Sequence, residues 1–293
     1  MTVVYNGYSQ DELDLQYNMG FSPYMPDGIT VRRMFGRQGP LRDSALINLD
    51  FSRQCVETLK PTKIPYGEDS KQIADLYKAD GNNSPCVMML SGGGYINNRR
   101  RVWCQWSKKC LEAGISFVDI GQPSMPDYSL SGLMKSIENF IQWFSEHSTE
   151  YGIDPNKIII ASHSSGTTIM ATCLARLVNK KFTPNILGAI FISGTYDLLP
   201  VSLTFRQKVM KITQEEVLEC SAIRNLMEPL PPVLVCCGDE TDEMKRQQHE
   251  FAEKVNFRGD AELIIFPLNH FALGMELYEE DSKMWNFITK LCQ

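Results

Sequence analysis

Two apolar patterns alternate along this chain from about residue 62 onward, and each predicts a different element. Short and nearly continuous apolar runs are typical of strands in a sheet that is covered on both faces. Such runs predict strands at Lys63–Tyr66, Gln72–Tyr77, Cys86–Leu90, Ser116–Ile120, Lys157–Ala161, Leu187–Ile192, Val233–Cys237 and Glu262–Phe266.

The segments between these runs carry apolar residues at helical spacing, which predicts helices with one buried face. We expect these helices at Val102–Ala113, Leu130–Tyr151, Thr167–Asn179, Glu243–Asn256 and Ser282–Cys292. Strands that alternate with helices in this way are typical of an α/β fold, with a mostly parallel central sheet and helices on both faces.

Two segments fall outside this alternation. Residues 1–60 are polar and irregular apart from a short helix expected at Asp11–Tyr17, so they are predicted to wrap around a single domain that comprises residues 1–293. Residues 196–229 lie between two predicted core strands and carry helical patterns of their own. Because ordinary connections are shorter, this segment is predicted to form a small cap over the site.

The β-branched run Ile158–Ala161 ends in the sequence Ser162-His163-Ser164-Ser165-Gly166. A serine with small residues two positions before and after it is typical of a nucleophile elbow, in which a tight strand-to-helix turn exposes the hydroxyl. Ser164 is therefore the candidate nucleophile. The alternative is a serine-rich turn that only caps the following helix.

A serine hydroxyl needs a base at neutral pH, and His270 is the histidine best placed to supply one. It follows the predicted strand Glu262–Phe266, in a loop expected at the carboxyl edge of the sheet. His147 and His249 lie in polar or charged helices, and His163 is expected to point away from its neighbour, the nucleophile.

The acid of a catalytic triad is expected in the loop after the strand Val233–Cys237, where four carboxylates occur close together. Asp242 is the predicted acid, placed to fix the tautomer of the histidine, and Asp239 remains an alternative. Asp242 could equally cap the helix that follows. The order nucleophile, acid, base along the chain is the one expected of α/β-hydrolases.

The glycine-rich segment Ser91–Tyr95 follows a predicted buried strand and is a candidate oxyanion hole. Backbone N–H groups of Gly93 and Gly94, together with that of Ser165, are predicted to face the developing negative oxygen. A phosphate-binding loop is disfavoured because the spacing of neither a P-loop nor a dinucleotide fold is present.

Aromatic side chains near this loop are candidates for substrate contact. Tyr95 and Tyr196 are the predicted substrate-binding residues, although Tyr95 and Phe205 could equally fill the core.

The overall charge restricts the partners, since the 293 residues carry a net charge of −6 at pH 7 and the pI is about 5.4. An acidic surface argues against nucleic-acid binding, which needs basic side chains. The run Arg99–Arg101 is the exception, and a solvated basic surface is the favoured interpretation of it. The alternative is that one of these arginines reaches a substrate carboxylate.

Cysteine usage and the N-terminal sequence indicate the compartment. Nine cysteines without a Cys-x-x-Cys pair indicate reduced, mostly buried thiols and offer no metal site. No signal peptide and no apolar run of membrane-spanning length is evident, so a cytoplasmic enzyme without membrane partners is expected. The sequence leaves the oligomeric state open, with a homodimer as one option.

Together these motifs resemble the kynurenine formamidase (arylformamidase) branch of the α/β-hydrolases, over nearly the whole length from Tyr17. The matching residues are Gln16-Tyr17-Asn18, Tyr66-Gly67, Gly92-Gly93-Gly94-Tyr95, His163-Ser164, Ser193-Gly194, Tyr196-Asp197-Leu198, Arg246-Gln247 and Asn269-His270-Phe271. The family usually has a histidine where Ser91 stands and a glycine where Ser162 stands, and the first difference bears on how the oxyanion loop is anchored.

The resemblance implies an α/β-hydrolase fold and a Ser–His–Asp hydrolase that needs no metal or cofactor. It also implies a small formyl or acyl substrate, with N-formyl-L-kynurenine hydrolysed to kynurenine and formate. An esterase or amidase acting on another small acyl substrate is the nearest alternative. A binding protein or cyclase that kept the pocket but lost hydrolysis is the second.

Overall fold

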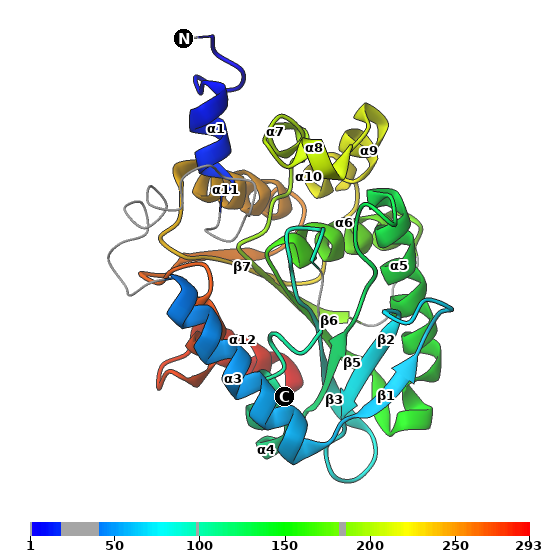
Figure 1. The fold of residues 1–293 in the computed structure, drawn as a ribbon. Coiled ribbons are helices and arrows are strands. Elements are labelled where there is room, and N and C mark those ends of the chain that lie inside the picture. Colours follow the sequence, from blue (N-terminus) through cyan, green and yellow to red (C-terminus); the bar gives the residue numbers. More distant parts are fainter. Residues whose placement is uncertain (1, 19–40, 98–99, 182–185) are drawn as a thin grey trace.

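The structure of the chain is a computed structural model that describes residues 2–18, 41–97, 100–181 and 186–293 (Figure 1). Its centre is an eight-stranded sheet in the order β1-β2-β4-β3-β5-β6-β7-β8. The strands are β1 Thr62–Pro65, β2 Ile73–Tyr77, β3 Ser84–Leu90, β4 Ser116–Ile120, β5 Ile153–His163, β6 Ile186–Ile192, β7 Val233–Cys237 and β8 Ala261–Ile265. Each of the predicted strands is therefore confirmed, with small shifts at the ends.

The pairing of the strands is mostly parallel, as predicted. Only β2 pairs antiparallel with its neighbours β1 and β4 within this sheet, and the pairs from β4 through β8 are parallel. Parallel strands need crossover connections, which are helices here. The fold is an α/β-hydrolase fold.

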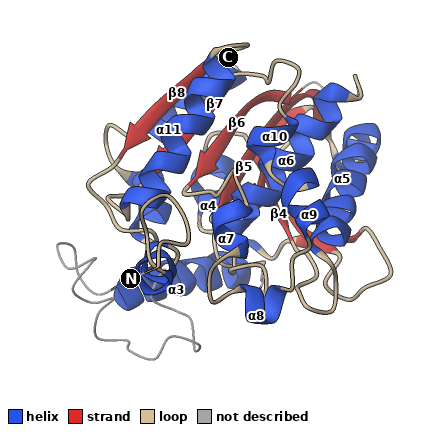
Figure 2. Cartoon of the chain, turned by 90° about the horizontal axis from the view of Figure 1, so that it is seen from above, coloured by secondary structure: helices blue, strands red, loops and turns tan. Residues whose placement is uncertain are grey.

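Helices cover both faces of the sheet (Figure 2). One face packs against α5 Leu130–His147, α6 Ser165–Asn179 and α11 Asp242–Asn256, and the other against α4 Trp106–Glu112 and α12 Lys283–Cys292. The central strands are continuous apolar runs because both of their faces are buried. In β3, Met88 and Leu90 pack in the core on the first face of the sheet, and Val87 and Met89 pack in the core on the other face.

The prediction for the N-terminal segment is partly wrong. The short helix is confirmed as α1 Gln10–Gln16, but α3 Leu41–Leu59 is a long helix in a stretch that was expected to be irregular. Its apolar side chains gave no clear buried face, because Leu46, Ile47 and Leu49 are exposed. Helix α3 packs its second half on the core, through Val56 and Leu59, and also makes polar contacts with distant residues.

Those contacts reach the loop that carries the predicted base. Asn48 Nδ2 donates to the carbonyl of Phe271, and Asn269 Nδ2 donates to Ser44 Oγ at 3.0 Å. Ser52 Oγ also donates to Gln105 Oε1 at 2.7 Å. Helix α3 therefore supports the residues on either side of His270.

The segment between β6 and β7 comprises four short helices that lie together at one end of the molecule (Figure 1). They are α7 Leu199–Ser202, α8 Gln207–Met210, α9 Gln214–Glu219 and α10 Ala222–Asn225. Among the described residues, no helix is both long and apolar enough to cross a bilayer.

Candidate active site

Ser164 joins the end of β5 to the start of α6 in a strained turn. Its backbone has φ +57° and ψ −130°, values that a non-glycine residue rarely adopts. Small neighbours allow this turn, since a Cβ added to Gly166 would lie 2.3 Å from the carbonyl oxygen of Leu90. The geometry is that of a nucleophile elbow.

His270 lies in the loop after β8 and contacts a buried carboxylate. Its Nδ1 is 3.0 Å from Glu240 Oε2, and both side chains are almost fully buried. An ionised carboxylate can only accept a hydrogen bond, so Nδ1 carries the hydrogen and Nε2 is left as the basic nitrogen. This pairing fixes the tautomer that a general base requires.

Glu240 is held in place by further donors. Its Oε1 accepts hydrogen bonds from the hydroxyl of Ser193 and from the backbone N–H of Gly238 at 3.2 Å. Burial would raise the pKa of Glu240, but the charge of His270 and these hydrogen bonds outweigh it, so the pKa lies below its usual value. The carboxylate is therefore negative next to His270.

The prediction that Asp242 is the acid beside the histidine is wrong. Asp242 is the first residue of α11, and its side chain is 86% exposed and lies 3.6 Å from Lys245 Nζ. The alternative, Asp239, is also exposed and pairs with Lys245. The sequence held a usable signal, because Thr241 is a good N-cap and caps α11 by accepting from Met244 N–H, which turns Asp242 outward.

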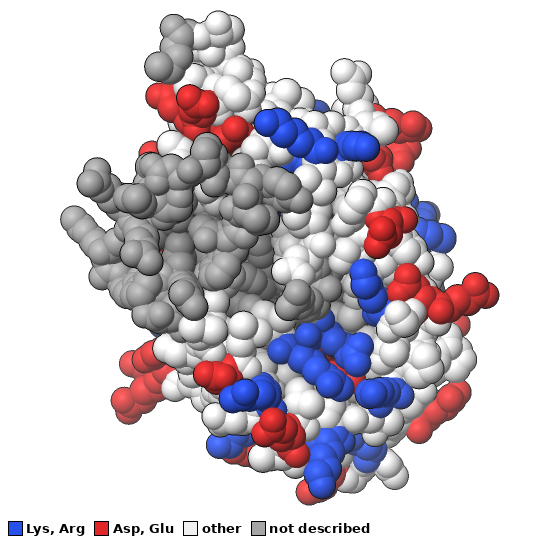
Figure 3. All heavy atoms as spheres, viewed as in Figure 1, with Lys and Arg blue, Asp and Glu red and all other residues white. Residues whose placement is uncertain are grey.

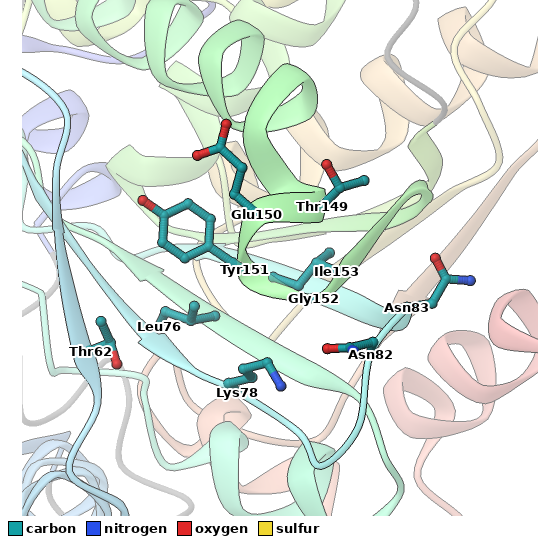
Figure 4. A pocket seen from close by; sticks show the side chains of 10 residues that line it. All are labelled: Thr62, Leu76, Lys78, Asn82, Asn83, Thr149, Glu150, Tyr151, Gly152 and Ile153. Carbon is teal, nitrogen blue, oxygen red and sulfur yellow. The ribbon is translucent and has the colours of Figure 1, made fainter.

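Ser164 and His270 line one small cavity of about 30 Å³. The other lining residues are Tyr17, Gly94, Tyr95, Ser165, Ser193, Thr195, Val201, Arg206 and Met244. A larger hollow of about 470 Å³ lies at the opposite ends of the strands, where β3 and β5 begin (Figure 4). Ligands of such sheets bind at the carboxyl ends of the strands, so the small cavity is the candidate active site.

Comparisons with known proteins show what the chain as a whole is similar to. A family model described as BD-FAE matches residues 74–189. The kynurenine formamidase of Danio rerio is 24% identical over 97% of this chain and 96% of its own length, and that of Salmo salar is 23% identical over 78% and 80%. An esterase of Pyrobaculum calidifontis has a TM-score of 0.72 at 19% identity, and the match covers 93% of this chain and 94% of that chain.

The chain has an α/β-hydrolase fold and resembles the kynurenine formamidases. Several of the motifs on which the sequence resemblance rests hold the scaffold together. Tyr17 donates to Glu243 at 3.0 Å and accepts from Gln247 at 2.7 Å, and Arg246 pairs with Glu243. This network ties the N-terminal segment to α11.

The glycine loop of the hydrolase is held by a side chain that the sequence did not single out. Ser165 Oγ accepts the backbone N–H groups of Gly93 at 3.0 Å and of Tyr95 at 3.2 Å. The N–H of Gly93, predicted to serve the oxyanion, is therefore engaged by Ser165. Gly94 and Ser165 line the cavity, so their N–H groups remain the candidates.

Ser91, where the resemblance led us to expect a histidine, does not anchor this loop. Its hydroxyl is buried and has no hydrogen-bond partner within the described residues. Because the Ser165 hydroxyl binds two N–H groups of the loop, it supplies the anchoring from the elbow itself.

The two tyrosines that were predicted to bind substrate have different positions. Tyr95 lines the cavity, but its hydroxyl lies 2.8 Å from the hydroxyls of both Thr168 and Thr195. Tyr196 is fully buried and stacks on Phe251 at 3.9 Å between ring centroids, so the prediction of a substrate contact is wrong for Tyr196. It is part of the core.

His163 does not line the cavity, and its side chain packs beside the predicted base, His270. Its ring lies between Trp103, at 4.3 Å, and His270, at 4.5 Å, and its Nε2 donates to the carbonyl of His270 at 3.0 Å. Burial and the nearby His270 lower the pKa of His163 well below its usual value. The neutral ring positions the backbone of His270.

The arginine run after the glycine loop lies away from the cavity. Arg100 and Arg101 both pair with the buried Asp75 of β2, at 2.8 and 2.6 Å, whereas Arg99 lies outside the described residues. Both side chains are partly buried in these ion pairs. They therefore form neither the solvated surface nor the substrate contact that the sequence suggested. Figure 3 shows that basic side chains gather near the middle of one face with acidic ones around them.

The cysteines agree with the expectation of buried thiols. All nine are free, and eight are buried. Within the described part of the chain, no cluster of three histidine, cysteine or acidic side chains could hold a metal ion.

Proposed function

We propose that this hydrolase cleaves the formamide bond of N-formyl-L-kynurenine, or of a close aryl formamide, to release formate. The observation that carries the proposal is that Ser164 and His270 line one cavity while Glu240 pairs with His270 from behind it. The near full-length similarity to kynurenine formamidases supports the choice of substrate. The free cysteines support the cytoplasm as compartment, because thiols persist in a reducing environment.

In the proposed reaction, His270 Nε2 takes the proton of Ser164 as its oxygen attacks the formyl carbon. The N–H groups of Gly94 and Ser165 bind the negative oxygen of the tetrahedral intermediate. The C–N bond then breaks, and the amine leaves with the proton from His270. Water, deprotonated by His270, attacks the formyl ester and releases formate and free Ser164.

The size of the cavity supports a small acyl group. The cavity beside Ser164 is small, and a formyl group has only a carbon and an oxygen to place next to the nucleophile. An esterase that acts on short acyl groups is the second candidate, because the same triad cleaves esters.

The first experiment is to follow release of kynurenine from N-formyl-L-kynurenine by wild type and by Ser164→Ala. We expect turnover in the wild type and a loss of about 10⁶-fold in the variant, as for removal of a catalytic serine. Labelling of Ser164 by a fluorophosphonate without formamide turnover would favour the esterase. If Ser164 resists labelling, a non-hydrolytic role gains support.

A further inference from the structure

Arg206 brings a positive charge into the cavity from the segment between β6 and β7. It precedes helix α8 and lines the same cavity as Ser164 and His270. Its Nη1 lies against the glycine loop, since a Cβ added to Gly94 would be 2.6 Å from that nitrogen. The guanidinium is therefore next to a candidate oxyanion donor.

No carboxylate among the described residues lies within ion-pairing distance of Arg206. Its Nη2 donates to the backbone carbonyl of Tyr17 at 3.0 Å, and the guanidinium lies 5.3 Å from the ring centroid of Phe205. The nearby Asp14 accepts the backbone N–H of Phe205 at 2.7 Å instead. By contrast, five other arginines each pair with a carboxylate: Arg100, Arg101, Arg176, Arg224 and Arg246.

An arginine stays charged at neutral pH, and a desolvated charge is costly unless an opposite charge accompanies it. The guanidinium has five N–H donors, and a single carbonyl cannot satisfy them. Because the guanidinium lines the cavity beside Ser164 and has no carboxylate partner among the described residues, it offers a site for an anion. A carboxylate suits this site best because its two oxygens match the guanidinium fork.

We propose that Arg206 binds a carboxylate of the substrate and thereby places the scissile carbonyl between Gly94 and Ser164. This inference rests on the proposed function and narrows the substrate class to aryl formamides, or related acyl compounds, that carry a carboxylate on the leaving group. Arg206 acts as a specificity residue that selects anionic over neutral substrates.

The test compares two formamides that differ in the carboxylate: N-formyl-L-kynurenine and the neutral 2-formamidoacetophenone. We expect Arg206→Gln to lower kcat/KM for the anionic compound by roughly 100-fold, with a change of only a few-fold for the neutral one. Arg206→Lys keeps the charge without the fork and should give an intermediate loss. Lys208→Gln removes an exposed charge two residues away and serves as the matched control.

Equal losses for both compounds in Arg206→Gln would overturn the inference, because the residue would then support the oxyanion or the glycine loop. If this variant fails to fold, competitive inhibition of the wild-type enzyme tests the carboxylate site instead. Kynurenine should then compete much better than kynurenine amide, and equal inhibition would contradict the proposal.

Failure of the proposed function would be seen separately. If the wild type hydrolyses neither formamide, the same variants are assayed with 3-acetoxybenzoate and the neutral 3-acetoxybenzamide. A preference for the benzoate that Arg206→Gln abolishes would support the carboxylate site on an esterase. A ratio that the variant leaves unchanged would overturn it.

Discussion

Two buried carboxylates of this hydrolase have opposite pKa shifts. Glu240 accepts hydrogen bonds from the His270 ring, the Ser193 hydroxyl and a backbone N–H, and its pKa lies below the usual value. Asp119 of β4 accepts only the backbone N–H of Arg101 within the described residues, and burial raises its pKa to about 7.

The difference shows that donors, and not burial, decide which interior carboxylate is charged. Asp119 lies directly opposite Asp75 in the antiparallel pair of β2 and β4, and Asp75 takes the ion pairs of both Arg100 and Arg101. A second negative charge opposite the first is disfavoured, and no further donor reaches Asp119 Oδ1 from the described residues. Of these two carboxylates, Glu240 is the one that contacts a histidine and can stabilise a positive charge on its ring.

The largest expected effect comes from removing the charge of Glu240. Glu240→Gln should lower kcat by roughly 10⁴-fold, as when a triad carboxylate becomes an amide, because the amide no longer fixes the His270 tautomer. Steady-state kinetics on the best substrate provide the measurement. Near-normal turnover, with the variant folded, would mean that another group orients His270.

A smaller effect is expected from Ser165, where a neutral hydroxyl and not a carboxylate accepts two backbone N–H groups. Ser165→Ala should lower kcat by roughly 10- to 100-fold with little change in KM, because the glycine loop loses its anchor and the oxyanion donors become less ordered. Ser145→Ala in α5, whose hydroxyl donates to the Gln142 carbonyl of its own helix, is the control. Equal kinetics of the two variants would contradict this role.

Asp119 is expected to affect stability and not catalysis. Its folded-state pKa of about 7 exceeds the usual 3.8, so its protonated form stabilises the fold below pH 4 and this contribution is lost as the pH rises toward 7. At about 1.4 kcal/mol per pKa unit, the loss is at most about 4 kcal/mol. Urea unfolding of wild type and Asp119→Asn from pH 5 to 8 measures it, and parallel pH curves would exclude the effect.

The smallest effect is expected for Asp242, the acid predicted from the sequence. Asp242 is mostly exposed and contacts only Lys245 among charged groups of the described residues, so Asp242→Asn should change kcat less than about twofold. The same assay as for Glu240→Gln checks this. A loss comparable to that of Glu240→Gln would show that the two carboxylates exchange roles in solution.

The sequence by itself determined the strands, their alternation with helices, and the elbow at Ser164. These features depend on local rules. An apolar run reports burial on both faces of a strand, and small residues such as Gly166 report a close approach of backbones. The candidacy of His270 followed from its position after the last strand.

Only the tertiary structure decided which side chains meet. Glu240 and not Asp242 faces His270 because α11 begins at Asp242, and Tyr196 enters the core because Phe251 of α11 lies against its ring. Helix α3 is stabilised by partners more than fifty residues away, and Arg206 reaches Gly94 from a distant segment. Such contacts leave no periodic trace in the sequence, because they depend on how separate elements pack and not on the spacing within one element.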